Sequence, residues 1–312
     1  MKKKLFGSKK SLKKAFQFWQ VYVMALPGVV YLIINNYIPM AGLVVAFKKF
    51  SVVKGLWGSD WIGFENFKYL FGTRDAWTIT RNTILYNGAF IFIGTVCSIV
   101  IAILLNDLRS SRARKVSQSL MFLPFLVSWP IVSYLVFGFL SSDNGFINHS
   151  ILVPLGLDSV SWYTSPEHWP VIMIIVFLWH NVGYTSIVFY ASIVGIDDTY
   201  YEVADLEGAT RMQKIFHVTL PSIRTVIITL VMLNIGRIFY SDFGLFYQVP
   251  MNTGALFPTT NVIDTYVYRG LLEQGNIGMS SAAGLYQSIV GFILILISNA
   301  AIRRIDRDSA FF

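Results

Sequence analysis

Six runs of apolar residues, each close to the length that crosses a bilayer, restrict this chain to a bundle of membrane helices. A transmembrane helix needs about 20 mainly apolar residues, because the hydrocarbon core is about 30 Å thick and a helix rises about 1.5 Å per residue. Only 13% of the 312 residues are charged, whereas soluble domains carry about 25%. The sequence therefore predicts an all-α, polytopic membrane protein. The expected spans cover residues 21–47, 82–105, 116–140, 170–193, 222–240 and 280–302.

The placement of Lys and Arg predicts how these spans are oriented. Six spans put both termini on one side, and sixteen basic residues fall on that side against six on the other. Cytoplasmic segments carry the excess of Lys and Arg, so we expect a multi-pass protein of the cell (plasma or inner) membrane with both termini in the cytoplasm. The net charge of +8 then reflects orientation in a membrane and does not indicate nucleic acid as a partner.

The first twenty residues form a basic segment with seven lysines. They act either as an orientation signal or, from Ser11 onward, as a short basic amphipathic helix on the inner membrane surface. Residues 21–312 then make up the transmembrane domain, with its core at 80–302. The single cysteine, Cys97, lies in mid-span, so no intramolecular disulfide is possible.

A polar, charged island separates the fourth and fifth spans and is expected to form two short helices. Asp197 or Asp198 can cap the start of the first helix, because an aspartate oxygen accepts bonds from free N–H groups. Gly208 ends it, since glycine tolerates the positive φ of a helix end. A second helix is expected over 210–218, stopping before Pro221.

This island, residues 197–221, resembles the EAA signature of permease subunits from binding-protein-dependent ABC importers. The family pattern reads E-A-A, three residues, G, nine residues, I-x-L-P. Three positions depart mildly: Val203 replaces alanine, Glu207 replaces aspartate and Val218 replaces isoleucine. We call residues 197–221 the EAA-type loop. The positions in register are Glu202, Ala204, Gly208, Leu220 and Pro221.

The resemblance implies a type I ABC importer permease fold in which this loop is a cytoplasmic coupling helix that docks on an ATPase subunit. Glu202 would pair with a basic group of the ATPase, and Gly208 would set the bend between the two helices. The implied partners are a second, related permease subunit, two ATPase subunits, membrane lipid and an extracytoplasmic substrate-binding (lipo)protein. The expected ATPase-coupling residues are Glu202, Ala204, Glu207, Gly208, Ala209, Leu220 and Pro221.

The chain itself is not expected to be an enzyme or to hold a cofactor. It contains no G-x-x-x-x-G-K-S/T loop that would cradle ATP phosphates, and no His or Cys spacing typical of a metal site. ATP and Mg are therefore expected in the partner ATPase subunits.

Segments after the fifth span resemble the oligosaccharide or polysaccharide (LplB-like) branch of these permeases, which implies a carbohydrate substrate. They lie at 261–270, 281–292, 305–306 and 309–312. Together with the EAA-type loop, the resemblance covers most of the chain.

Polar side chains inside spans are costly in lipid and mark a polar interior. Asn181 and Tyr184 are three residues apart, so they are expected on one face of a helix. In sugar importers of this superfamily, substrate contacts come from the helices flanking the loop; Ile238 stands where an amide is usual. The alternative is that these residues hold helices together, with Arg237 paired to Asp242. The candidate substrate-binding residues are Asn181, Tyr184, Asn234, Arg237, Ile238 and Asp242.

Two other functions fit parts of the pattern. An ABC importer for another solute, such as glycerol phosphate or a peptide, is one, because Arg237 suits an anion. A secondary carrier that works alone is the other. Buried carboxylates that relay protons are nearly absent from the spans, which disfavours a proton-coupled carrier.

Overall fold

The computed structural model describes residues 18–305, with side chains to Arg304. The expectations for the basic segment before Phe18 and for residues 309–312 lie outside this range. Within it, the only strands are β1 (Lys48–Lys49) and β2 (Asp60–Trp61), which pair antiparallel. The helices are α2 (Trp19–Leu32), α3 (Ile38–Met40), α4 (Gly55–Gly58), α5 (Glu65–Phe71), α6 (Arg74–Asn106), α7 (Ser111–Phe122), α8 (Trp129–Leu140), α9 (Trp169–Val194), α10 (Thr199–Leu206), α11 (Arg211–Lys214), α12 (Leu220–Ser222), α13 (Arg224–Gly236), α14 (Phe257–Thr260), α15 (Ile263–Leu272) and α16 (Ile277–Ile305).

Ten short 3-10 or π turns complete the described helical structure. The 3-10 turns are η2 (Ala41–Phe47), η3 (Leu123–Leu126), η5 (Val153–Leu155), η6 (Trp162–Thr164), η7 (Pro166–His168) and η10 (Gly254–Leu256). The π turns are η1 (Ile33–Tyr37), η4 (Asn148–Leu152), η8 (Ile215–Thr219) and η9 (Gly244–Gln248).

Within residues 18–305, four helical segments are long and apolar enough to cross a membrane. Two further pairs of helices qualify only if each bent pair is one span: Ser111–Leu126 with Trp129–Leu140, bent by 97°, and Arg211–Ser222 with Arg224–Gly236, bent by 62°. The all-α membrane fold is confirmed, and six spans are reached only by counting both bent pairs. The four unbroken segments are Trp19–Phe47, Arg74–Asn106, Pro166–Val194 and Ile277–Arg304.

The prediction of continuous spans at 116–140 and 222–240 was wrong in shape. The first is broken where Val127 and Ser128 adopt extended backbone, between Pro124 and Pro130. Pro130 lies in the first turn of α8, where its missing N–H is not needed. The second bends at its start, and α13 ends at Gly236, so residues 237–240 are not helical as predicted.

Each π turn in the described part ends two residues before a proline. The proline ring crowds the carbonyl four residues earlier and offers no N–H to it, and a widened turn accommodates that carbonyl. The helix of the EAA-type loop therefore runs through Pro221 to Ser222 and does not stop before the proline as predicted. The prolines that follow η1, η4, η8 and η9 are Pro39, Pro154, Pro221 and Pro250.

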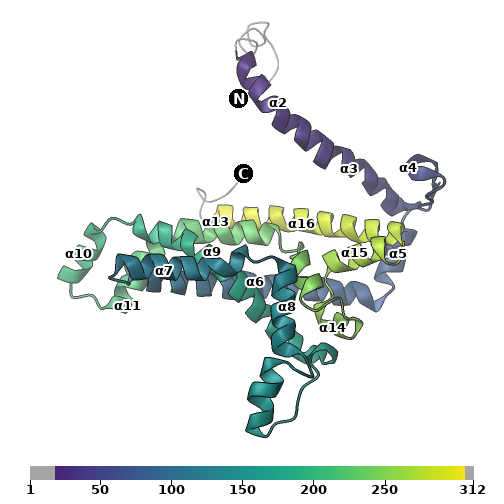
Figure 1. Cartoon of the computed structure of the whole chain (residues 1–312). Coiled ribbons are helices and arrows are strands. Elements are labelled where there is room, and N and C mark those ends of the chain that lie inside the picture. The colour runs from purple at the N-terminus through teal and green to yellow at the C-terminus, as the bar shows by residue number, and fades with distance from the viewer. Residues whose placement is uncertain (1–17, 306–312) are drawn as a thin grey trace.

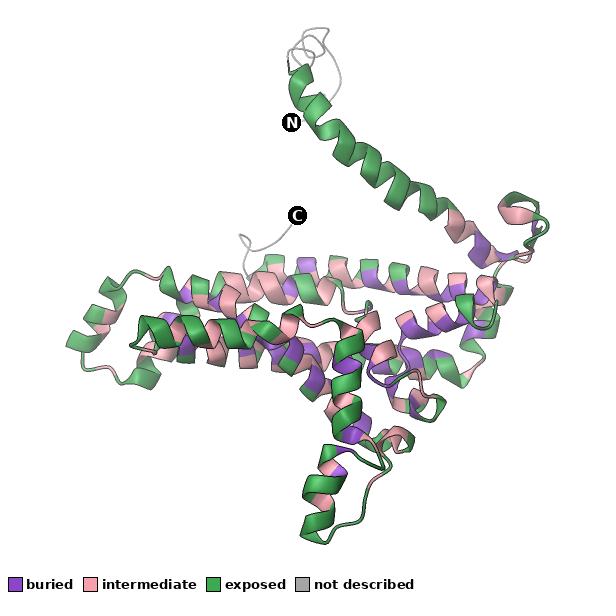
Figure 2. Cartoon of the chain, in the orientation of Figure 1, coloured by how far each residue is buried: buried purple, intermediate pink, exposed green. Residues whose placement is uncertain are grey.

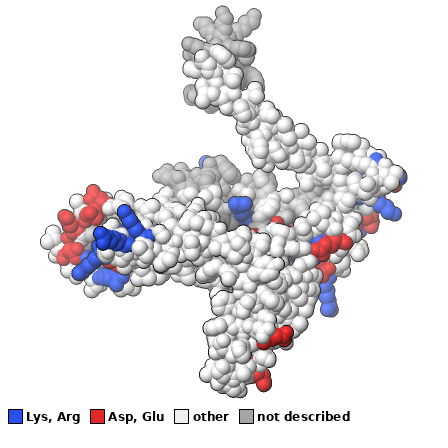
Figure 3. All heavy atoms as spheres, in the orientation of Figure 1, with Lys and Arg blue, Asp and Glu red and all other residues white. Residues whose placement is uncertain are grey.

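The long helices lie side by side in an elongated body (Figure 1), in which α6 packs along α9 and α13 packs along α16. The EAA-type loop forms one end of this body, and α5 and α15 lie toward the other. Helix α2 leaves the body and has no buried residue (Figure 2). Charged side chains gather mainly at the ends, and uncharged surface covers the helices between them (Figure 3), as expected for an apolar belt in lipid.

Close packing of α9 against α7 depends on Gly183. A Cβ built there would lie 1.7 Å from the backbone oxygen of Met121. Small residues of this kind let membrane helices approach closely, so Gly183 fixes how near the two helices lie.

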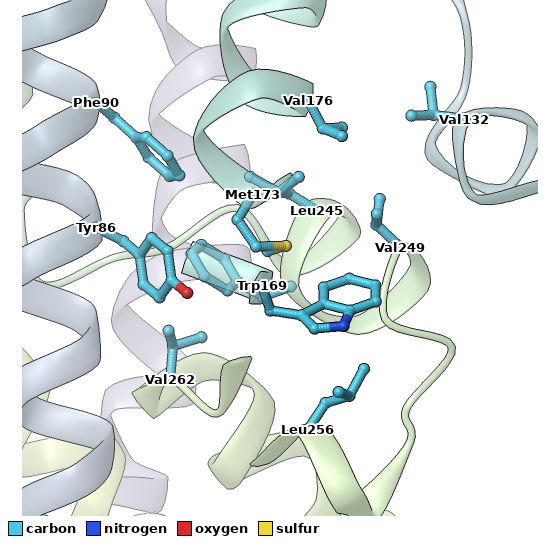
Figure 4. Packing of buried hydrophobic residues seen from close by; sticks show 11 residues of the cluster. Tyr86, Phe90, Val132, Trp169, Met173, Val176, Leu245, Val249, Leu256 and Val262 are labelled. Atoms are coloured by element: carbon cyan, nitrogen blue, oxygen red, sulfur yellow. The ribbon is translucent and has the colours of Figure 1, made fainter. Parts of the chain in front are cut away.

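Two clusters of buried apolar side chains lie at different heights along α6 and α9. The far cluster lies near the start of α9 and includes Trp169, Met173 and Val176 (Figure 4). The loop-side cluster comprises Ala102, Phe189, Ile193 and Ile223. The space between the two clusters is where polar residues of α6, α9 and α13 face one another. The far cluster contains Tyr86, Phe90, Val132, Trp169, Met173, Val176, Leu245, Phe246, Val249, Leu256 and Val262.

Candidate functional sites: the EAA-type loop and a polar cavity

The first helix of the EAA-type loop starts at a cap supplied by Asp197. Its Oδ1 accepts bonds from the backbone N–H of Thr199 at 2.9 Å and from the Thr199 hydroxyl at 2.8 Å. These bonds hold the pKa of the Asp197 carboxyl below its usual value. Asp198 occupies the N-cap position without a side-chain bond, so of the two predicted caps Asp197 is the one that binds.

The first helix ends at Gly208, as the sequence predicted. Its φ is +72°, a left-handed conformation that favours glycine. The N–H of Ala209 donates to the carbonyl of Ala204 at 2.9 Å, and that of Gly208 to Asp205 at 3.0 Å. This pair of bonds is the Schellman arrangement, which satisfies the last carbonyls of a helix.

The second helix starts at a capping box. The Thr210 hydroxyl accepts from the Gln213 N–H at 3.4 Å, and the Gln213 side chain accepts from the Thr210 N–H at 2.7 Å. Both boundaries around Gly208 are thus fixed by local bonds. The bend between the helices follows from the sequence of this short stretch.

Side-chain bonds tie the two helices to each other and to the body. Lys214 pairs with Asp205 across the bend, and the Tyr201 hydroxyl lies 3.0 Å from the Thr219 hydroxyl. Arg211 pairs with Asp107, the residue that follows α6. The loop is therefore joined to the end of α6 as well as being continuous in sequence with α9 and α13.

A groove of about 350 Å³ lies in the bend of the loop. Four of the predicted coupling residues line it: Ala204, Glu207, Gly208 and Ala209. The other three lie elsewhere. Glu202 and Pro221 are exposed, and Leu220 packs against the loop-side cluster.

The outer surface of the loop is unusually apolar for a charged segment. Leu206 is 89% exposed, and Val203, Met212 and Phe216 are each exposed by more than half. Clustered exposed apolar side chains mark an interaction surface. The described residues leave this surface uncovered.

A cavity of about 440 Å³ lies between α6, α9, α13 and the residues that follow α13. It is lined by four of the predicted substrate-binding residues, Asn181, Asn234, Arg237 and Asp242. Phe90 and Phe177 form part of its wall, with stacked rings 3.9 Å apart. The cavity therefore offers amide, guanidinium, carboxylate and aromatic groups in one place.

Tyr184 and Ile238 do not line this cavity. Tyr184 stacks on Phe125, with ring centroids 4.6 Å apart, and Ile238 packs against a buried cluster to which α5, α6, α15 and α16 all contribute. On α9 the residue that accompanies Asn181 is Thr185, because a spacing of four returns to nearly the same face of a helix. Tyr184, three residues from Asn181 on the same continuous helix, turns toward Phe125 and does not reach the cavity.

Arg237 and Asp242 both face the cavity without an ion pair between them in the described structure. The Asp242 Oδ1 accepts from the N–H of Leu245 at 3.3 Å, and so caps the turn that follows. No carboxylate among the described residues pairs with the Arg237 guanidinium. The predicted alternative of an Arg237–Asp242 pair is absent.

Sequence reasoning missed the contribution of α6. Asn87, Thr95 and Ser98 of this helix line the cavity, together with Ile91 and Gly94. Their spacing of three, four and seven residues is that of one helix face, and this pattern could have indicated them. Tyr240 and Ser241 were missed because the break after Gly236 was not predicted.

Comparison with known proteins places these features among transport proteins. Residues 94–308 match the family described as binding-protein-dependent transport system inner membrane component. The chain is 33% identical to the protein LplB of Bacillus subtilis (strain 168) over 292 residues, which cover 93% of this chain and 91% of LplB. It is 31% identical to the polygalacturonan/rhamnogalacturonan transport system permease protein YteP of the same organism over 303 residues, covering 97% and 94%.

A solved structure agrees with these matches. One chain of a bacterial ABC transporter involved in the import of the acidic polysaccharide alginate superposes with a TM-score of 0.87 and 33% identity. The match covers 96% of this chain and 100% of that chain. A crystal structure of a bacterial alginate ABC transporter in complex with an alginate pentasaccharide-bound periplasmic protein matches with a TM-score of 0.85.

Proposed function

Because the chain belongs to the family of inner membrane components of binding-protein-dependent transport systems, we propose that it is one permease subunit of an ATP-driven importer for a sugar or oligosaccharide. The observation that carries the proposal is the polar cavity between two apolar clusters. Amides and hydroxyls bond to sugar hydroxyls, and the Phe177 ring offers a face for the apolar side of a sugar. Relatives named for polygalacturonan, rhamnogalacturonan and arabinooligosaccharide transport support a carbohydrate.

The EAA-type loop is the site where we place the ATPase subunits. Its exposed apolar residues need a partner surface, and Glu202 has no basic partner among the described residues. A basic group of the ATPase would pair with Glu202, and Gly208 holds the bend that the ATPase grips. ATP and Mg bind to the ATPase subunits, and this chain contributes no catalytic residue.

Movement of the loop reaches the cavity through three helices. Each helix that walls the cavity ends at the loop or beside it: α6 before Asp107, α9 at Val194 and α13 at Arg224. The Arg211–Asp107 pair and the packing of Leu220 link the loop to these ends. Closure of the ATPases would therefore shift α6, α9 and α13 together. The cavity would then open past the far cluster or past the loop-side cluster, but not past both at once.

A second, related permease subunit would complete the pathway. Helix α2 is apolar along its length and exposed throughout, so lipid and a partner subunit are the surfaces available to it. An extracytoplasmic binding protein would deliver substrate from the side opposite the loop. Both termini would then lie in the cytoplasm.

The test is purification of the membrane complex through a tag on this chain, followed by reconstitution in liposomes. We expect a second permease and an ATPase to co-purify, and uptake of an oligosaccharide to require ATP and the binding protein. Isolation of this chain as a lone carrier that moves solute without an ATPase would contradict the proposal.

A second candidate is an importer for an anionic solute, such as glycerol phosphate, and one observation favours it. Arg237 faces the cavity with no described carboxylate partner, and a guanidinium binds carboxylate and phosphate well. Arg237→Gln should then abolish competition by anionic solutes while leaving competition by neutral oligosaccharides unchanged. Equal effects on both would remove this candidate.

A further inference from the structure

The chain is unwound between α13 and η9, and this unwound segment supplies much of the cavity. Residues 237–242 contain Arg237, Tyr240, Ser241 and Asp242, all of which line it. An unwound backbone loses the bonds that a helix makes internally, and buried N–H and C=O groups without partners are costly, above all near lipid. Local turn bonds satisfy the N–H groups of Arg237, Ile238 and Tyr240, and other parts of the protein supply partners for several of the remaining groups.

Asn87 of α6 supplies the first. Its Nδ2 donates to the carbonyl of Ile238 at 2.8 Å and to the hydroxyl of Ser241 at 3.1 Å. The unwound segment is thus bound from the α6 side at two points. Asn87 also lines the cavity, so it can touch a substrate as well.

Asp264 of α15 and Gln287 of α16 supply the others. The N–H of Ser241 donates to the Asp264 Oδ2 at 2.7 Å, and the Gln287 Nε2 donates to the carbonyl of Phe239 at 2.6 Å. Gln287 also donates to the Asp264 Oδ1 at 3.1 Å, so the two side chains form one unit. Neither lines the cavity.

Burial of the Asp264–Gln287 unit leaves few other hydrogen-bond partners for its two side chains. Gln287 is 5% exposed, and burial raises the pKa of the Asp264 carboxyl, while the bonds from Ser241 and Gln287 oppose that rise. A buried carboxylate that accepts two such bonds makes stronger bonds than a neutral acceptor would. Besides its own turn bonds and the contact between the Tyr240 and Ser288 hydroxyls, the unwound segment is held by this pair on one side and by Asn87 on the other.

We propose that Asp264 and Gln287 are positioning residues that form a backbone clasp on residues 237–242 and thereby present Arg237, Tyr240 and Asp242 to the cavity. That the cavity binds a substrate is taken from the proposed function, and the inference rests on it in that respect. Helices α15 and α16 contribute no residue to the cavity lining. In this proposal they still belong to the substrate site, because their side chains hold the backbone of residues 237–242.

The test measures the segment directly, without a substrate. A cysteine replaces Tyr240 in a Cys97→Ser background, and its rate of maleimide labelling is followed in the purified complex. Hydrogen bonds to buried charged groups are among the costlier ones to lose, so Asp264→Ala should raise the labelling rate about tenfold or more. Gln287→Ala should raise it by a smaller factor.

Two further variants keep the result interpretable. Asp264→Asn preserves the volume of the side chain but replaces one acceptor oxygen with an N–H donor. The variant should therefore assemble normally and still speed labelling several-fold. The exposed Glu65, bonded only to Lys68 in the described structure, provides the control, and Glu65→Gln should change nothing. Labelling rates of Asp264→Asn and Gln287→Ala equal to the parent would overturn the clasp.

Uptake measurements separate this inference from the proposed function. With the clasp variants, the KM for the transported sugar should rise about tenfold while the maximal rate stays within about twofold, because the walls still move but the lining is misplaced. Faster labelling in a complex that takes up no sugar would support the clasp and sink the sugar assignment. Normal KM and normal labelling in a transporting complex would sink the clasp alone.

Discussion

The EAA-type loop and the polar cavity are built in opposite ways. Bonds within a stretch of about two dozen residues define the loop: the Schellman turn at Gly208, the capping box at Thr210 and the Asp205–Lys214 pair. The cavity is defined by bonds between distant parts of the chain, such as Asn87 to Ser241, 154 residues apart. The loop can therefore keep its shape while it moves, whereas the cavity must change shape when its helices move.

This difference predicts two classes of variant. Changes in the loop should impair coupling to ATP and leave the affinity for substrate unaltered. Changes in the cavity should alter affinity and leave ATP-driven movement intact. Four sets of variants test whether the two classes separate.

Gly208→Val should abolish transport while insertion and assembly remain normal. A β-branched residue is strained at the positive φ of this position, so the bend that faces the ATPase would be lost. ATP-dependent uptake in liposomes measures the effect. Gly156→Val is the matched control, because Gly156 has a φ of +74° and, like Gly208, open space around it but lies far from the loop in sequence. Near-normal uptake by Gly208→Val would refute the role of the bend.

Gly183→Ala should impair both regions, because α9 runs from the far cluster through the cavity to the loop. The new methyl group would collide with the Met121 backbone, and overpacking of this kind costs about 1–3 kcal/mol. Thermal unfolding in detergent should show the loss of stability. Gly88→Ala, on α6, would place its new methyl group with no atom within 4 Å apart from its chain neighbours and the nearby backbone of its own helix. Because alanine favours a helix over glycine, this variant should not lower the melting temperature; equal losses for both variants would contradict the close contact.

Asn181→Ala should raise the KM for uptake about tenfold, the expected effect of losing a hydrogen bond worth about 1.4 kcal/mol. Tyr184→Ala should leave KM within about twofold, because Tyr184 stacks on Phe125 outside the cavity. Initial uptake rates over a range of sugar concentrations measure both. A larger change in KM for Tyr184→Ala than for Asn181→Ala would reverse our assignment of the lining.

Arg211→Asp should lower the coupling of ATP hydrolysis to uptake only a few-fold, because the Arg211–Asp107 pair is exposed and such pairs contribute about 0–1 kcal/mol. The ratio of sugar transported to ATP hydrolysed measures coupling. The double variant Arg211→Asp with Asp107→Arg should restore it. A double variant as impaired as the single one would show that the pair does not link the loop to α6.

The contrast between the regions also explains what the sequence could predict. Capping and turn chemistry around Gly208 depends on neighbours in sequence, so the bend and the end of the first helix were predicted correctly. The continuation of the second helix through Pro221 was not predicted. It depends on the π turn before the proline, a widening of the backbone that the residue pattern does not show. The all-α membrane fold was predicted because apolar length alone decides it.

The cavity was predicted only in part, for a physical reason. Asn181, Asn234 and Arg237 were found because polar groups stand out in apolar spans, and Asp242 because it continues the same face just past the fifth predicted span. The face of α6 and the break after Gly236 depend on packing between helices that are far apart in sequence. Which neighbour Tyr184 meets is likewise decided by the bent helix pair beside it.

Cross-linking from Leu206, which is 89% exposed on the EAA-type loop, decides whether a separate ATPase grips that loop. A photoreactive residue replaces Leu206, and the complex is illuminated while it transports sugar in liposomes. We expect a covalent product between this chain and the ATP-hydrolysing subunit. A transporting complex that gives no such product, or gives one only with the extracytoplasmic binding protein, would contradict it.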